Sequence, residues 1–317
     1  MAEILKRQTP FVRLLGFIVL FLGCMILYNG LLLGGALSGV FHVTPAVLAK
    51  GDFSDPQVLS GVKAVQLCYS LICFLLPALL FNLLFSRKPF ADAGLAGPLL
   101  PSLLLLAVVI LAASLPFAGV LADWNRQIHF PWGMDAPLRE LERRAADMTR
   151  SLLVMPDVGV LLYNLLLIAI VPAIAEEWFF RGVLQRLLIR MSGRPWLGIL
   201  IAAVIFSLLH GEMLGFFPRL ALGIVLGCLF YFSGSLWTAI TAHFLNNGLQ
   251  IVLTYLHQHH HIAFDITQDT PTPLAAGAVS GVLTIALFLL FRKLSGDRAG
   301  LRGPEATEKA VSSPPAS

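Results

Sequence analysis

Long apolar stretches alternate with short polar connections along the whole chain. Eight stretches are close to the length that a helix needs to cross the hydrocarbon core of a bilayer, about 20 residues. They cover residues 14–33, 62–85, 99–121, 158 to about 188, 196–214, 219–232, 236–256 and 274–291. The pattern predicts an all-α, polytopic membrane protein with about eight transmembrane helices.

Composition supports this class and excludes others. The chain of 317 residues is 57% hydrophobic and 13% charged, which is not typical of a soluble globular domain. No basic patch interleaved with aromatic residues is present, so we expect no nucleic-acid partner. The four cysteines lie inside apolar stretches without CxxC spacing and are interpreted as small buried side chains. The expected partner is the lipid bilayer, and nothing in the sequence sets an oligomeric state.

Basic residues mark one side of the membrane. They flank the apolar stretches at Lys6, Arg7, Arg13, Arg87, Lys88, Arg186, Arg190, Arg194, Arg292, Lys293, Arg298 and Arg302. The positive-inside rule then places these connections and both termini in the cytoplasm. We predict a cytoplasmic N-terminus over residues 1–13, a transmembrane domain over 14–291, and a disordered cytoplasmic tail over 292–317, which is rich in Pro, Ser and Ala near its end.

The longest polar connection, residues 123–157, is expected on the far side. Apolar residues recur there at a spacing of three or four, namely Leu138, Leu141, Ala145, Met148 and Leu152. This spacing predicts an amphipathic helix that lies at the membrane interface. Glu140 and Arg144 are four residues apart on it and are expected to pair.

Charged residues appear in the fourth apolar stretch, where a membrane helix normally carries none. A charge at bilayer depth costs at least a few kcal/mol, so such residues usually face a protein interior or a water-filled cavity. Glu177 and Arg181 stand at i,i+4 and are predicted to pair. Glu176 points about 100° away around the helix, so this pair leaves it free. Pro172 is expected to disturb the helix one turn before Glu176.

Two later stretches carry histidine and asparagine. His210 closes the segment Phe206-Ser-Leu-Leu-His210, and the seventh stretch contains His243-Phe-Leu-Asn-Asn247. At 1.5 Å per residue, Glu176 lies about 21 Å from Arg190 and His210 about 24 Å from Arg194. Counted from the turn at Ser235, His243 lies at about 12 Å and Asn247 at about 18 Å. Similar depths on three helices favour one site near the middle of the bilayer. The pair Gly223 and Gly227, at GxxxG spacing, predicts close helix packing.

These three motifs, in this order, resemble those of the CPBP family. The family comprises the type II CAAX prenyl endopeptidases and the bacteriocin-processing or self-immunity membrane proteins, also called Abi. The resemblance covers residues 158–256, the predicted catalytic core. It implies a glutamate-type intramembrane endopeptidase that cleaves peptide or membrane-protein substrates. It also implies a site open to the cytoplasm, and the breadth of the family favours a bacterial inner membrane.

The resemblance also implies the roles of the site residues. Glu176 corresponds to the glutamate that activates water, with His210 as its partner. His243 and Asn247 correspond to the pair that stabilises the oxyanion. Glu177, Arg181 and Phe206 correspond to supporting residues.

Three alternatives stay open. Glu176, His210 and His243 are also potential zinc ligands, and zinc-bound water would attack a peptide bond as readily. We nevertheless expect no cofactor, since the sequence has no HExxH motif and Asn247 is a good hydrogen-bond donor but a poor zinc ligand. A proton-coupled transporter would also bury carboxylates and histidines at mid-depth. A non-catalytic scaffold or immunity protein on the same fold is the third alternative.

Overall fold

The computed structural model describes residues 2–44, 46–47, 55–263 and 270–296. Within these ranges the chain forms helices and no strands, so the predicted all-α fold is confirmed. Most of the predicted tail, residues 297–317, lies outside the described residues.

The α-helices are α1 (Ala2–Leu5), α2 (Pro10–Leu33), α3 (Ala36–Phe41), α5 (Pro56–Tyr69), α6 (Leu76–Phe85), α7 (Pro89–Asp92), α8 (Pro101–Arg126), α9 (Asp135–Leu152), α10 (Val158–Asn164), α11 (Val171–Glu177), α12 (Arg186–Ser192), α13 (Pro195–Leu209), α14 (Phe216–Ser233), α15 (Leu236–Gln258) and α16 (Leu274–Ser295). Three π-helical turns, η1 (Ser70–Leu75), η2 (Leu165–Ile170) and η3 (Trp178–Gln185), continue neighbouring α-helices, and η4 (Met213–Gly215) is a 3-10 turn. Proline opens many of the long helices, because its fixed φ suits the first turn and its missing N–H is not needed there.

Six helical stretches are long and apolar enough to cross a membrane: Pro10–Leu33, Pro56–Phe85, Pro101–Arg126, Val158–Ser192, Met213–Ser233 and Leu274–Ser295. The protein is therefore a multi-pass membrane protein, but the predicted number of eight spans is not confirmed. α15 is long enough but is not among the six, and it carries polar residues in its middle.

The fifth predicted stretch, 196–214, ends earlier than expected. α13 stops at Leu209, followed by Gly211 in a left-handed conformation (φ +73°) that the helix cannot continue through. Its 15 residues extend about 22 Å, less than the hydrocarbon core of about 30 Å. The last residue of its motif, His210, is therefore at a helix end.

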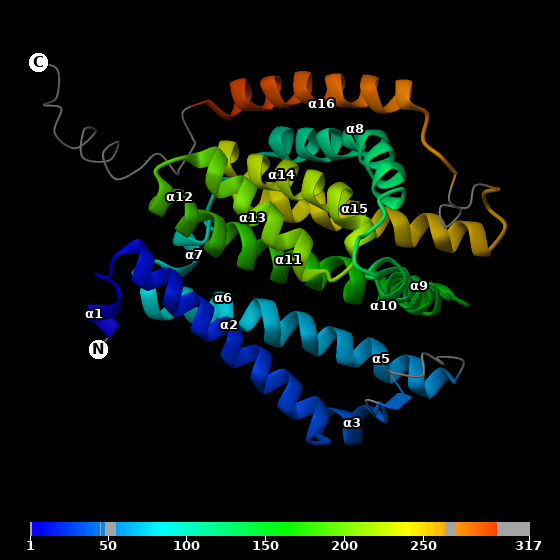
Figure 1. Cartoon of the computed structure of the whole chain (residues 1–317). Helices are drawn as coiled ribbons and strands as arrows, with labels where there is room; N and C mark the ends of the chain where they lie inside the picture. Colours follow the sequence, from blue (N-terminus) through cyan, green and yellow to red (C-terminus); the bar gives the residue numbers. More distant parts are fainter. Residues whose placement is uncertain (1, 45, 48–54, 264–269, 297–317) are drawn as a thin grey trace, which may run out of the picture.

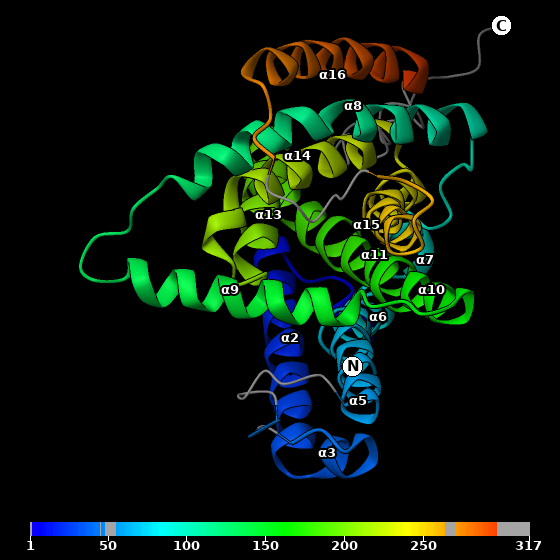
Figure 2. The same cartoon turned by 90° about the vertical axis from the view of Figure 1, so that its right-hand side faces the viewer.

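The helices are arranged in three layers (Figures 1 and 2). α2, α5 and α6 form one side, α8 and α16 form the opposite side, and α11 to α15 lie between them. α11 packs against η1 and α15, while α13 packs against α14. The middle layer carries all three motifs, so protein surrounds most of their polar side chains.

Helix α9 confirms the predicted amphipathic helix. It crosses one end of the bundle and contacts α5 and η4, as Figure 2 shows. The predicted pair is present, with Nε of Arg144 2.8 Å from Oε1 of Glu140. Hydrogen bonds from Arg143 and then Arg144 lower the pKa of Glu140 to about 2.

The predicted close packing at Gly223 and Gly227 is also confirmed. A Cβ added to Gly223 would lie 3.0 Å from Cβ of Ala203 on α13, and one added to Gly227 would lie 2.7 Å from Oε1 of Gln185 on η3. The two glycines thus let α14 approach both neighbours, which brings polar groups of η3 within reach of the α14 backbone.

Candidate active site

The glutamate pair lies in one long helical stretch, Val158–Ser192, between two π-helical turns. η2 precedes α11, and η3 begins directly after Glu177. Pro172 has no N–H to donate to the carbonyl of Ile168, four residues earlier. The predicted disturbance thus takes the form of a π turn rather than a break. Such turns occur frequently at functional sites, because they change the direction of the side chains that follow.

A buried ionic cluster of Glu177, Arg181 and His243 joins two of the motifs. Oε1 of Glu177 accepts hydrogen bonds from Nη1 of Arg181 at 2.6 Å and from Nδ1 of His243 at 2.8 Å. All three side chains are at most 4% exposed. The pair of Glu177 and Arg181 was predicted, whereas the bond from His243 was not. The cluster fixes α15 against α11 at the level of the glutamates.

Two further contacts hold Arg181 in place. Its Nη2 donates to the carbonyl oxygen of Gly223 at 3.1 Å, and its guanidinium lies 4.6 Å from the ring centroid of Phe206. Gln185, one turn later, donates to the carbonyl oxygen of Gly227 at 3.0 Å. Sequence reasoning missed Gln185, although a polar residue four positions after Arg181 in an apolar stretch was a usable indication.

Glu176 differs from its neighbour in having no hydrogen bond to any described residue, whereas Oε1 of Glu177 has two and only its Oε2 is unpaired. The side chain of Glu176 is partly buried, and its Oε2 is buried without a hydrogen bond. The carboxylate lies within electrostatic range of Arg181 and of Tyr69, at the end of α5. A buried carboxylate oxygen without a partner reduces stability. This arrangement is therefore better explained by chemistry than by packing.

His210 lies at the exposed end of α13. Its Nδ1 donates to the carbonyl oxygen of Phe206 at 2.7 Å, which leaves Nε2 as the acceptor of a neutral ring. The ring of Phe206 lies between the motifs, with its centroid 4.7 Å from that of His210 and 6.1 Å from that of His243. Within the described ranges, no hydrogen bond joins Glu176 to His210.

Asn247 donates a hydrogen bond to the backbone carbonyl group of Ile168, to which Pro172 has no N–H to donate. Its Nδ2 donates to the oxygen of Ile168 at 3.3 Å, while its Oδ1 accepts from Nδ2 of Asn246 at 3.1 Å. One N–H of the Asn247 amide remains for a substrate. Asn246 was not singled out from the sequence, and its position next to Asn247 was the only indication of this role.

The hydrogen bond to Glu177 also decides which ring nitrogen of His243 is free. Because Nδ1 of His243 already donates to Glu177, a proton added to that ring would go to Nε2.

The residues named as alternative zinc ligands do not form a metal-binding cluster. Over the described part of the chain, no three His, Cys, Asp or Glu side chains are placed to hold a metal ion. Nδ1 of His243 donates a hydrogen bond to Glu177, and Nδ1 of His210 donates one to a backbone carbonyl group. On each ring, only Nε2 therefore remains to bind a metal ion.

The part of the chain that carries the three motifs matches a known protein family. Residues 158–249 match the family described as type II CAAX prenyl endopeptidase, Rce1-like. This segment resembles an Rce1-like domain. The resemblance to the CPBP family is thereby confirmed, and the match supports a CAAX-type protease by family membership. Neither the curated proteins nor the solved structures contain a match to the chain.

Proposed function

We propose that the protein is a glutamate-type intramembrane endopeptidase that cleaves membrane-associated peptides. The observation that carries this proposal is the contrast between the two neighbouring glutamates. Oε1 of Glu177 accepts hydrogen bonds from Arg181 and His243, whereas Glu176 has no hydrogen bond to any described residue. A free carboxylate in a medium of low dielectric constant is suited to accept a proton from water.

In the proposed mechanism, Glu176 takes a proton from water as the water oxygen attacks the peptide carbonyl carbon. Nε2 of His210 shares this proton. When the tetrahedral intermediate collapses, the C–N bond breaks and the proton passes to the leaving amine. Donors aimed at the oxyanion stabilise the intermediate. The remaining N–H of Asn247 is one such donor, and Nε2 of His243 is a second when it carries a proton.

Glu177 and Arg181 act as positioning residues in this mechanism. The bond to Glu177 fixes the ring of His243 with Nδ1–H toward the carboxylate, so that Nε2 points to the substrate. Arg181 in turn holds the carboxylate of Glu177 in place through their contact at 2.6 Å. Loss of either residue would disorder a donor rather than remove a reacting group.

We also propose that both termini are cytoplasmic, in a bacterial inner membrane. His210 caps α13 at the end remote from Arg194, and η4, which follows it, contacts α9. Access past His210 would then come from the far side, contrary to the cytoplasmic opening that the resemblance implies. Labelling of Arg190→Cys and His260→Cys in intact cells, without native cysteines, tests the topology. We expect an impermeant reagent to label only the latter, and the reverse result would contradict it.

The activity is tested on purified protein in liposomes with a prenylated CAAX peptide and a panel of transmembrane peptides. Glu176→Gln should abolish cleavage, while Glu140→Gln, in an exposed ion pair, should leave it unchanged. Near-normal turnover by Glu176→Gln would show that the base is misassigned. Proton flux into the same liposomes that depends on Glu176 would favour the transporter, and no cleavage by the wild type would favour the scaffold.

A further inference from the structure

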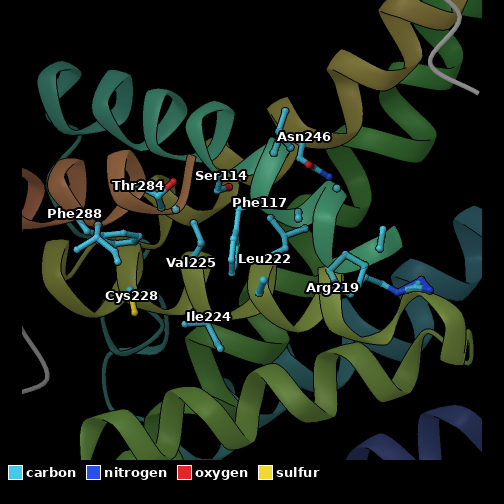
Figure 3. A pocket seen from close by; sticks show the side chains of 18 of the residues that line it. Ser114, Phe117, Arg219, Leu222, Ile224, Val225, Cys228, Asn246, Thr284 and Phe288 are labelled. Atoms are coloured by element: carbon cyan, nitrogen blue, oxygen red, sulfur yellow. The ribbon is translucent and has the colours of Figure 1, made fainter. Parts of the chain in front are cut away.

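A large cavity lies between α8, α14, α15 and α16, and its volume is about 1070 Å³ (Figure 3). α16 packs along α8 and touches α14 more sparsely, which leaves this space between the layers. The lining is mostly apolar and includes Phe117, Leu222, Val225 and Phe288. Glu176, Glu177, His210, His243 and Asn247 do not line it, although Asn246, which bonds to Asn247, does. The cavity therefore adjoins the candidate active site without containing its reacting groups, and its size suits a large ligand.

One end of the cavity carries a rim formed by Trp196, Phe232 and Arg292. The rings of Trp196 and Phe232 have centroids 6.0 Å apart, and the guanidinium of Arg292 lies 5.7 Å from the Phe232 centroid. Trp196 and Arg292 are both exposed, and no carboxylate among the described residues pairs with Arg292. Tryptophan is typical of the membrane–water interface, where lipid headgroups lie.

The opposite end is electrically neutral. Arg219 lines it too, but both of its Nη atoms bond to Oε2 of Glu212, at 2.7 and 2.6 Å. Of the two arginines that line the cavity, therefore, only Arg292 is available to an anion. The cavity thus has an apolar interior and one cationic, interfacial end.

Measured along α16, the cavity is about as long as one leaflet of a bilayer. Gly281, the lining residue of α16 farthest from the rim, is eleven positions before Arg292. At 1.5 Å per residue this is about 16 Å, and half of the hydrocarbon core is about 15 Å. A lipid with its phosphate at the rim would therefore place its chains along the cavity as far as Gly281.

We propose that this cavity binds one anionic phospholipid, with its acyl chains between α14 and α16 and its phosphate on Arg292. The planar guanidinium donates to phosphate oxygens in pairs, which a zwitterionic headgroup matches less well because its own cation competes. The ligand is a bilayer component bound as a cofactor-like group, independent of the peptide that the active site takes.

Native mass spectrometry of the detergent-purified protein tests whether the cavity prefers an anionic headgroup. We expect phosphatidylglycerol to bind more tightly than phosphatidylcholine. Arg292→Gln should weaken phosphatidylglycerol binding about fivefold, the effect of one basic residue at an anionic surface. Lys293→Gln, also exposed but outside the cavity, should leave it unchanged. Equal affinity of the wild type for both lipids would overturn the proposal.

A second pair of variants tests whether the lipid lies in this cavity. A Cβ at Gly281 meets only Phe117, at 3.5 Å, so Gly281→Phe places a ring in the cavity without a backbone clash. It should lose both lipids, whereas Val282→Phe on the exposed face should keep them. Retention of phosphatidylglycerol by Gly281→Phe, or its displacement by a cleaved peptide, would overturn the proposal. Since binding is measured without hydrolysis, neither result affects the proposed protease activity.

Discussion

Replacing Glu177 by glutamine should destabilise the protein far more than the same change at Glu176. Glu177 is fully buried and accepts hydrogen bonds from Arg181 and His243. Its loss would leave the guanidinium, 1% exposed, without its hydrogen-bonded counter-charge. Glu176→Gln removes no hydrogen bond from Oε2, because that atom has none.

The expected cost of Glu177→Gln is about 3–5 kcal/mol, the range for breaking a buried pair by removal of one partner. The bond from Arg181 to Gly223 survives, which favours the lower part of this range. Glu140→Gln is the matched control, since this carboxylate also bonds to arginines but is exposed. Exposed pairs contribute at most about 1 kcal/mol.

The assay is the free energy of unfolding in mixed micelles, measured for both single variants and for Glu177→Gln/Arg181→Met. The double variant removes both charges and should recover more than half of the loss, because the cost lies mainly in the unpaired cation. It should stay less active than the wild type, since the neutral amide oxygen at position 177 holds the ring of His243 less firmly than a carboxylate does. A loss below about 1 kcal/mol for Glu177→Gln, or an equal loss for Glu176→Gln, would refute the reasoning.

Four further outcomes are expected. His243→Ala and Asn247→Ala should each reduce kcat by about 10²–10³-fold in single-turnover assays, as loss of an oxyanion donor does. Pro172→Ala should supply an N–H to the carbonyl of Ile168 and release Asn247, lowering kcat about tenfold while KM changes little. Gly223→Leu should reduce the free energy of unfolding by about 1–3 kcal/mol, because the new side chain meets α13. Peptide cleavage should survive exhaustive chelation, and loss of activity that stoichiometric zinc restores would support the zinc alternative.

The amino-acid pattern alone determined the fold class and the local pairs. In a bilayer every backbone group must bond within the protein, so long apolar stretches have to become helices. Contacts one turn apart follow from helical geometry, and so the pair of Glu177 and Arg181 was predictable. The close approach at Gly223 and Gly227 was predictable for a similar reason, since two glycines one turn apart leave a groove on a helix surface.

Tertiary structure decided what the local patterns do not contain. The bond between Glu177 and His243 joins residues 66 positions apart, and it depends on how α15 rotates against α11. The exposed position of His210 depends on where α13 ends, at a left-handed glycine within a stretch that is apolar on both sides. The cavity behind Arg292 exists because α16 packs mainly on α8 and contacts α14 only sparsely. Each of these features depends on how whole helices pack against one another. Hydrophobic periodicity shows which face of a helix is buried, but it gives neither the neighbouring helix nor the distance between the two.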